Sequence, residues 1–384
     1  MPPRTGGPRR VLFVHSSAGH YGADRQLALL VRGLDRDRYA PLALLPFEGP
    51  LADELRADGV EVFSGALAIL RREHLTPGGI AQLGGEIARQ APRMERLLLA
   101  QRIDIVHANT SVVLGLRRPA ERAGAARVVH VREIYPPVPL AWPAHRRGLL
   151  RFDRVLCVSR AVREALGSEA PHVRVVHDGL AVEPRRAPRG AARLALGLPR
   201  DAFVVAVLGR ISGWKGQDVL ARALAEPALA ERGVIGLVAG DAWPGQERWE
   251  VGLRELAGRL GLGDRLRLAG FREDVETVYG AADVVAVPSV KPDPLPNSAL
   301  EAAAAGCCVV AAAHGGLPEI VRDGVTGRLV PPGDHAALAQ ELARLADDPE
   351  ARARLGERAA EDARARFAPE RLPAAVMAAY DELR

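Results

Sequence analysis

The chain of 384 residues is too long for one ordinary core and suits two domains of about 150 to 200 residues each. Its formal net charge of +5 is small beside 52 basic and 47 acidic residues, which is unlike the concentrated basic face of a nucleic-acid binder. The cysteines, Cys157, Cys307 and Cys308, lack the spacing of metal ligands or redox pairs, which favours a reduced, cytoplasmic setting.

The N-terminal segment from Met1 to Arg10 is polar and rich in Pro and Gly, and the apolar run after it has only four residues. A signal peptide needs a longer apolar core, and a membrane-spanning helix needs about 18 apolar residues. No stretch of the sequence reaches that length. We therefore expect neither feature, and any membrane contact should be peripheral, at the inner face of the membrane.

Short apolar runs alternate with helical patterns over the first half of the chain, which is typical of buried parallel strands joined by helices. The expected strands lie at residues 11–14, 43–45, 103–106, 128–131, 155–158 and 173–176. Expected helices include residues 23–34, 51–58 and 161–166. This pattern predicts a Rossmann-like, doubly wound α/β domain over residues 1–177.

From about His177 to Gly197 the chain is rich in Pro, Arg and Gly without a clear period, and we expect a linker there. A second series of expected strands follows at residues 203–208, 234–239, 266–269, 284–287 and 309–311. It predicts a second Rossmann-like domain over residues 178–366.

The tail from Asp334 to Arg384 has strong helical propensity, interrupted at Pro349, Pro369 and Pro373. We expect its last helix, within residues 367–384, to cross back to the first domain. Two such domains would face a central cleft formed by the carboxyl ends of both sheets, where open α/β sheets bind ligands.

Two segments of the second domain combine cations with carboxylates. Arg210 and Lys215 lie on a glycine-rich turn after an expected strand, and Asp293 and Glu301 flank the start of an expected helix. Carboxylates can hold sugar hydroxyls, whereas cations and the free N–H groups of a helix start hold phosphate oxygens. The combination predicts an enzyme that binds a sugar joined to a nucleoside diphosphate.

Taken together, these features resemble the retaining glycosyltransferases of family 4, which have the GT-B fold. The resemblance covers most of the chain and is strongest from Val204 to Asp334. The family motif has two glutamates eight positions apart, and Asp293 and Glu301 keep that spacing with Asp in the first place. By resemblance, Glu301 binds the ribose hydroxyls and Asp293 the hydroxyls of the donor sugar. A capping box over residues 298–301 is the structural alternative for Glu301.

The resemblance implies further contacts with the donor. Arg210 and Lys215 match a family element whose cations face the diphosphate and would stabilise the leaving nucleotide. Leu295-Pro296 stands where relatives usually carry a Phe-Gly pair, and proline lacks an N–H donor. Residues 270–272 resemble the segment whose backbone pairs with the base. The expected donor-binding residues are Gly19, Gly22, Gly209, Phe271, Arg272, Leu295, Asn297, Ser298 and Glu301.

In the first domain, Gly19 and Gly22 lie in a glycine-rich loop that leads into a helix, and such a loop presents N–H groups to phosphate. Tight turning alone would also explain these glycines. Relatives often carry a His near the reacting centre, and here His130 or Glu133 could orient or deprotonate the acceptor. A His inside an apolar strand is also often a core residue.

Two further clusters have a simpler explanation. The triplet at residues 35–37 has the D-x-D pattern of metal-dependent glycosyltransferases of another fold, but it lies in a polar turn and we expect a solvated loop. With Arg210 and Lys215 beside the diphosphate, we expect no metal or other cofactor. The basic residues between Trp142 and Arg154 could touch an anionic membrane surface, although a solvated face is the commoner role.

The sequence therefore predicts a retaining hexosyltransferase that uses a nucleoside-diphosphate sugar, with UDP-glucose or UDP-N-acetylglucosamine as the expected donor. Its expected catalytic residues are His130, Glu133, Arg210, Lys215 and Asp293. The acceptor would be a hydroxyl of a natural product such as an antibiotic core, a lipid or a polysaccharide. A nucleotide-sugar epimerase and a catalytically silent sugar-nucleotide binding protein remain alternatives. A dehydrogenase is disfavoured because no G-x-G-x-x-G follows the first strand of either domain.

Overall fold

The computed structural model describes residues 7–135, 141–183 and 185–383, so residues 1–6 of the polar N-terminal segment lie outside the described part. The chain divides into two compact units. The first comprises residues 1–181 together with residues 367–384, and the second comprises residues 182–366. Residues 178–181, which the sequence assigned to the second domain, thus lie in the first unit.

The first unit is built on a parallel sheet whose described strands follow the order β3-β2-β1-β4-β5-β6-β7. The strands are β1 (Arg9–Val14), β2 (Tyr39–Leu45), β3 (Glu61–Ser64), β4 (Ile105–Ala108), β5 (Ala126–Val131), β6 (Arg154–Cys157) and β7 (Val173–Val175). The apolar residues of β1 are completely buried, as expected for a sheet covered on both faces. The edge strand β3 is partly exposed, and the sequence pattern did not predict it.

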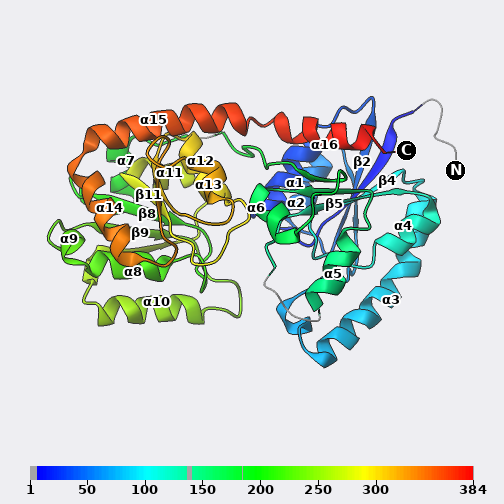
Figure 1. The fold of residues 1–384 in the computed structure, drawn as a ribbon, viewed down its shortest axis with the longest axis horizontal. Coiled ribbons are helices and arrows are strands. Elements are labelled where there is room, and N and C mark those ends of the chain that lie inside the picture. The colour runs from blue at the N-terminus through cyan, green and yellow to red at the C-terminus, as the bar shows by residue number, and fades with distance from the viewer. Residues whose placement is uncertain (1–6, 136–140, 184, 384) are drawn as a thin grey trace. The chain divides into compact units, whose positions relative to one another are not determined.

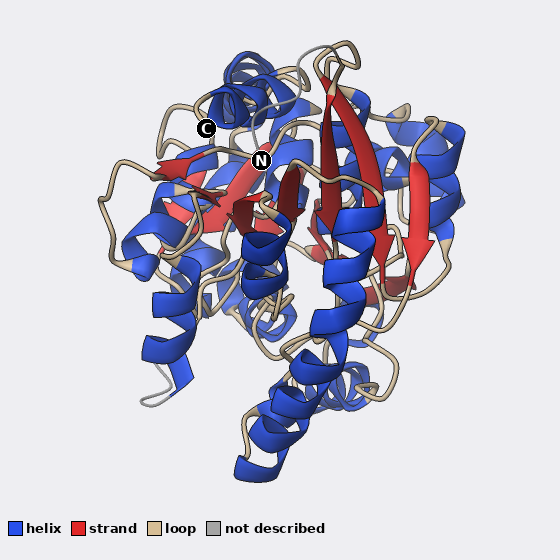
Figure 2. Ribbon diagram, turned by 90° about the vertical axis from the view of Figure 1, so that its right-hand side faces the viewer, coloured by secondary structure: helices blue, strands red, loops and turns tan. Residues whose placement is uncertain are grey.

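Helices lie on both sides of this sheet (Figures 1 and 2). They are α1 (Gly22–Arg32), α2 (Pro50–Ala57), α3 (Pro77–Ala100), α4 (Arg117–Ala123), α5 (Ala141–Leu149), α6 (Arg160–Leu166) and α16 (Arg371–Asp381), with a 3-10 turn η1 (Arg72–His74). The C-terminal helix α16 packs against α1 and shares a core with β1 and β2. Pro373 lies in the first turn of α16, where a backbone N–H is not needed, so the break expected at this residue does not occur.

The second unit repeats the same architecture with described strands in the order β10-β9-β8-β11-β12-β13, all parallel. The strands are β8 (Val204–Leu208), β9 (Ile235–Ala239), β10 (Leu266–Gly270), β11 (Val284–Val287), β12 (Cys308–Ala312) and β13 (Arg328–Val330). Both units therefore confirm the predicted pair of Rossmann-like, doubly wound domains.

Two groups of helices cover the two faces of the second sheet (Figure 1). One group is α8 (Gln217–Ala225), α9 (Pro227–Ala230), α10 (Arg248–Arg259) and α14 (His335–Asp347), and η2 (Gly263–Arg265) precedes β10. The other is α7 (Arg189–Ala195), α11 (Val275–Ala281), α12 (Asn297–Ala304), α13 (Leu317–Ile320) and α15 (Pro349–Arg366). Among the described residues, no helix combines the length and apolar composition needed to cross a bilayer.

The segment predicted to be a linker contains helix α7, so this expectation is wrong for its second half. Arg193 of α7 is almost completely buried, donates from Nε to the Ala281 carbonyl at 3.1 Å and pairs with Asp283 at 2.8 Å. The aliphatic stem of an arginine can pack like an apolar side chain while its head is paired. The polar composition of this segment therefore concealed a packed helix.

Candidate functional site

The turn after β8 carries both predicted cations and is held against the loop after β11. The Val290 N–H donates to the Trp214 carbonyl at 2.8 Å. Gly216 has a φ of +79°, and a Cβ there would overlap the Pro288 carbonyl oxygen, so only glycine allows this approach. The two loops are therefore fixed side by side.

Across these loops, Lys215 and Asp293 form an ion pair. The Lys215 ammonium donates to Asp293 Oδ2 at 2.7 Å, and Asp293 is only 4% exposed. The ammonium also lies 4.4 Å from the centre of the Trp214 ring. The Asp293 carbonyl accepts a hydrogen bond from Gly316 N–H at 2.7 Å, which fixes the backbone that carries the carboxylate. Two predicted catalytic side chains are thus in direct contact.

Arg210 lies at the start of the same turn and stacks on Trp243. Its guanidinium carbon is 3.3 Å from the centre of the indole ring, a cation–π contact. Burial lowers the pKa of Arg210 to about 10, and the nearby Asp241 carboxylate opposes that shift, so the side chain stays cationic at neutral pH. The Gln217 amide donates to the Arg210 carbonyl at 2.9 Å. The backbone of Arg210 is thus tied to Gln217, and its guanidinium is positioned by the Trp243 ring.

Glu301 lies in α12, whose residues from Ala299 to Ala304 are buried. The helix begins at Asn297 with Pro296 as its N-cap residue, whereas a capping box over residues 298–301 would need Ser298 as the N-cap. The capping-box alternative is therefore wrong. Glu301 is 8% exposed and accepts a hydrogen bond from the Tyr279 hydroxyl at 3.3 Å. The two oxygens of this carboxylate can accept further hydrogen bonds from the hydroxyls of a ligand.

The other predicted donor-binding residues of the second unit also follow strand ends or open α12. Gly209 directly follows β8, and Phe271 directly follows β10 and is 47% exposed. Arg272 is paired with Asp274 through two contacts of 2.9 and 2.6 Å. Leu295 is buried, whereas Asn297 and Ser298 in the first turn of α12 are half-buried.

In the first unit, three polar residues directly follow three neighbouring strands: His15 after β1, Asn109 after β4 and Arg132 after β5. His15 Nε2 lies 2.8 Å from Asp24, and His15 Nδ1 lies 3.2 Å from the Asn109 amide nitrogen. The sequence analysis missed His15, Asp24 and Asn109. Their position directly after buried strands was the signal that could have found them, because ligands of open sheets bind there.

The predicted loop glycines lie beside this network. Gly22 is the first residue of α1, and Gly19 lies three residues earlier. The Tyr21 N–H donates to Asp24 Oδ2 at 2.8 Å, which closes the capping box of α1. Asp24 thus fixes both the loop and His15.

Glu133 belongs to the same end of the first sheet. Its carboxylate accepts hydrogen bonds from the hydroxyls of Thr110 and Ser111 and from the Arg132 N–H at 3.1 Å. Arg132 in turn pairs with Asp178, and both side chains are 7% exposed. Glu133 is half-buried and held by donors on its own unit, so it is oriented before any ligand arrives.

His130 is a core residue. Its side chain is completely buried within β5, and its ring stacks on that of His107 with centroids 5.7 Å apart. Burial and, to a lesser extent, the positive charge of Arg132 hold the pKa of His130 well below its usual value. The structure therefore contradicts a direct contact between His130 and an acceptor, and of the two candidates only Glu133 reaches the surface.

The remaining clusters do not form a site. In the described residues, no three His, Cys, Asp or Glu side chains gather as metal ligands would. Asp35 and Asp37 are exposed, and the Asp37 N–H donates to Asp35 Oδ1 at 3.1 Å, as a solvated turn requires. Arg146 donates to the carbonyls that end α6, and Arg154 donates to Glu382.

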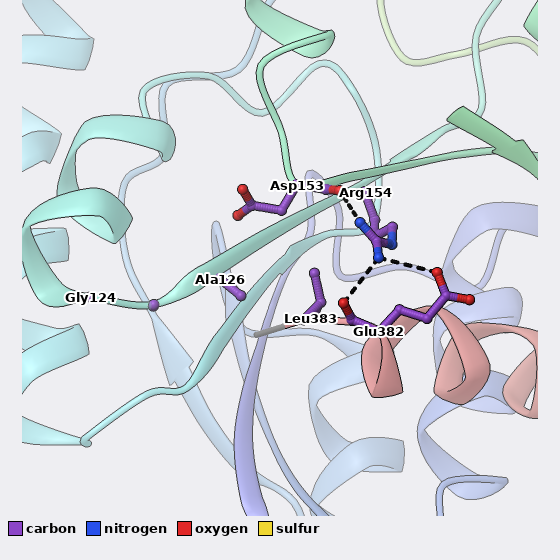
Figure 3. A pocket seen from close by; sticks show the side chains of 7 residues that line it. Gly124, Ala126, Asp153, Arg154, Glu382 and Leu383 are labelled. Atoms are coloured by element: carbon purple, nitrogen blue, oxygen red, sulfur yellow. Dashed lines mark hydrogen bonds and ion pairs between the residues drawn. The ribbon is translucent and has the colours of Figure 1, made fainter. Parts of the chain in front are cut away.

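A cavity of about 540 Å³ lies at the amino ends of the strands of the first sheet, at the end opposite to His15, Asn109 and Arg132 (Figure 3). Its lining includes Ala126 and Arg154, the first residues of β5 and β6, and Glu382 beyond α16. Arg154 donates to the Glu382 carbonyl at 3.0 Å and to its carboxylate at 3.1 Å. Since these charged groups satisfy one another, the strand ends that carry Arg210 and Lys215 are the stronger candidate site.

Two family models match successive parts of the chain. Residues 21–183 match Glycosyltransferase Family 4, and residues 189–362 match Glycosyl transferases group 1. Among curated relatives, the D-inositol 3-phosphate glycosyltransferase of Streptomyces coelicolor is 43% identical over 182 residues, which are 46% of this chain and 39% of that protein. The protein of that name from Saccharomonospora viridis is 44% identical over 218 residues, 55% of this chain and 50% of that protein. The matched part thus spans half of these relatives or less.

Solved structures are similar over nearly the whole chain. Anabaena HepE in complex with UDP and glucose has a TM-score of 0.81 at 27% identity, covering 97% of this chain and 99% of HepE. Sucrose-phosphate synthase from Thermosynechococcus elongatus has a TM-score of 0.79 at 21% identity, covering 97% and 98%. The chain thus has the GT-B fold expected from the sequence, and two successive parts of it match glycosyltransferase family models.

Proposed function

We propose that this protein is a retaining glycosyltransferase that moves a hexosyl group from UDP-glucose or UDP-N-acetylglucosamine to a hydroxyl of an acceptor. The observation that carries this proposal is the 2.7 Å contact between Lys215 and Asp293, with Glu301 in the helix that follows. A cation suits the diphosphate, and carboxylates suit the hydroxyls of the sugar and the ribose. The similarity to HepE, which was crystallised with UDP-glucose, supports the choice of donor.

In this proposal the two cations stabilise the departing nucleotide. Negative charge builds up on the diphosphate as the glycosidic bond breaks, and cations that are already in place lower that barrier. Arg210 stacked on Trp243 and Lys215 above Trp214 provide such fixed charges. They would do this work without a metal ion.

The proposed transfer keeps the configuration of the sugar. The acceptor oxygen would form its bond to the anomeric carbon on the face from which the diphosphate leaves. The bond between that carbon and the phosphate oxygen breaks, its electron pair departs with UDP, and the acceptor proton passes to a phosphate oxygen. Binding and orientation of both substrates would then supply most of the rate enhancement.

The proposed acceptor carries several hydroxyl groups. Glu133 is held by Thr110 and Ser111, and its carboxylate could accept a hydrogen bond from an acceptor hydroxyl and orient it. The curated relatives are named for an inositol phosphate, and the HepE crystals contained glucose. Both are polyhydroxylated rings, so inositols and hexoses are the first acceptors to test.

The experiment is a transfer assay with each UDP-sugar and a panel of acceptors that includes glucose, inositol and inositol 3-phosphate. We expect UDP to be released only with an acceptor, together with a product heavier by one hexosyl group in mass spectrometry. Lys215→Met should abolish release, whereas Glu255→Gln on the exposed face of α10 should not. An isomerised donor without acceptor would indicate an epimerase, and donor binding without turnover a silent binding protein.

A further inference from the structure

The proposed diphosphate site already contains an anion of its own. Lys215, one of the two cations of the turn, is paired with Asp293 at 2.7 Å. Both side chains are largely shielded from water, with side-chain exposures of 20% for Lys215 and 6% for Asp293. An ion pair in such surroundings is stronger than one in bulk water, and either partner left alone there is penalised.

A phosphate oxygen that binds Lys215 must compete with this carboxylate. An ammonium is a point charge on a flexible stem, so Lys215 can turn towards a new anion. Two anions around one shielded ammonium would repel each other. The Asp293 carboxylate therefore has to leave Lys215 when a diphosphate arrives.

The backbone around Asp293 limits this exchange to side-chain rotation. Gly316 donates to the Asp293 carbonyl, and a Cβ on Gly315 would overlap the Asp293 backbone. Lys215 is likewise tied to its loop, because its neighbour Trp214 accepts the Val290 N–H. Both loops can thus stay in place while the two side chains separate.

We infer that Asp293 is an internal occupant of the diphosphate site, displaced from Lys215 by the donor and thereby released to bind a hydroxyl of the donor sugar. The inference rests on the proposed function. When a complete UDP-sugar binds, a hydroxyl of its sugar becomes the new partner of Asp293 and compensates for the lost ion pair. UDP alone lacks that sugar and offers no such compensation. Asp293 would then favour binding of the UDP-sugar donor over binding of the UDP product. After transfer it would pair with Lys215 again and promote release of UDP.

The test is a calorimetric measurement of UDP and UDP-glucose affinity for the wild type, Asp293→Asn, Lys215→Met and the double variant. Asn keeps the shape of Asp293 without its charge. We expect Asp293→Asn to bind UDP about fivefold more tightly or better, with a smaller gain or a loss for UDP-glucose. In the Lys215→Met background the same substitution should no longer tighten UDP binding.

Weaker or unchanged UDP binding by Asp293→Asn would overturn the inference. It would mean that Asp293 helps Lys215 to bind UDP, or has no effect on that binding. If Lys215→Met bound UDP as tightly as the wild type, the proposed site itself would be wrong. Glu255→Gln on α10 serves as the charge control, and circular dichroism shows whether each variant is folded. Should Asp293→Asn fail to fold, Asp293→Ala gives the same comparison.

Discussion

The guanidinium of Arg210 lies over the indole of Trp243, with 3.3 Å between the guanidinium carbon and the ring centre. The two residues come from the ends of neighbouring strands, Arg210 after β8 and Trp243 after β9. Trp243, which the sequence analysis did not single out, thus positions the Arg210 cation. In the proposed reaction Arg210 faces the diphosphate, so Trp243 acts on catalysis through it.

Trp243→Ala should lower kcat/KM for the donor by about twofold to thirtyfold, because a cation–π contact contributes about 0.5 to 2 kcal/mol. Trp243→Phe should recover part of the loss, since a smaller aromatic face remains. Steady-state kinetics with varied donor concentration measure both effects. Equal activity of the Ala variant and the wild type would show that Arg210 needs no such support.

Glu301→Ala should weaken UDP binding by about tenfold to a hundredfold, because a hydrogen bond to a charged group contributes about 1.5 to 3 kcal/mol. The loss should be much smaller with a UDP analogue that lacks the ribose hydroxyls. Calorimetry with the two nucleotides makes the comparison. A similar loss for both would mean that Glu301 supports the structure of α12 and does not bind the ribose.

Glu133→Gln should raise the acceptor KM or lower kcat while the donor KM stays unchanged. The substitution keeps the shape of the side chain but weakens acceptance from the Thr110 and Ser111 hydroxyls and from the substrate. Kinetics at saturating donor with varied acceptor measure the effect. A change confined to the donor KM would place Glu133 outside the acceptor site.

Arg193→Ala should destabilise the protein by about 3 kcal/mol or more, because it leaves the shielded Asp283 carboxylate without its buried partner and opens space under α7. Urea denaturation followed by circular dichroism measures the loss. The matched change Arg189→Ala removes the exposed partner of the same Asp283 and should cost less than 1 kcal/mol. Equal losses would contradict the buried role of Arg193.

Stability should fall as the solution is acidified below pH 6.5. Burial lowers the pKa of His107 to about 3 and holds that of His130 well below its usual value. Both imidazoles are neutral in the folded chain, whereas the unfolded chain takes up protons below about pH 6.5. Each therefore adds stability above pH 6.5 that is lost on acidification, at up to about 1.4 kcal/mol per pH unit, and for His107 the loss continues towards pH 3.

Urea denaturation between pH 7.5 and 5 tests this dependence. His130→Leu replaces the imidazole with an apolar side chain that suits the core. In this variant, stability should fall clearly less per pH unit on acidification than in the wild type. His20→Leu, which replaces an exposed histidine, serves as the matched control. An unaltered slope in His130→Leu would show that this imidazole does not drive the acid sensitivity.

The sequence was sufficient for the fold because central strands such as β1 and β8 are continuous apolar runs, and such runs mark buried parallel strands. The edge strand β3 was missed because its two end residues, Glu61 and Ser64, are exposed and its apolar pattern is weak. Helix α7 was taken for a linker because a paired, buried Arg193 looks in sequence like a surface residue.

For the site, residue types and spacing indicated Arg210, Lys215, Asp293 and Glu301, but not their partners. The contact of Lys215 with Asp293 joins residues 78 positions apart, and no local pattern encodes it. His130 was misjudged because a histidine in a strand carries no sign of which face it occupies. The network around His15 was missed because each member is a single polar residue after its own strand.

The most direct test of the central claim is a crystal structure of the protein with UDP-glucose. The account predicts the diphosphate within hydrogen-bonding distance of Arg210 and Lys215, the ribose on Glu301, and Asp293 turned from Lys215 to a hydroxyl of the glucose. A nucleotide bound elsewhere, or one bound while Lys215 and Asp293 remain paired, would contradict it.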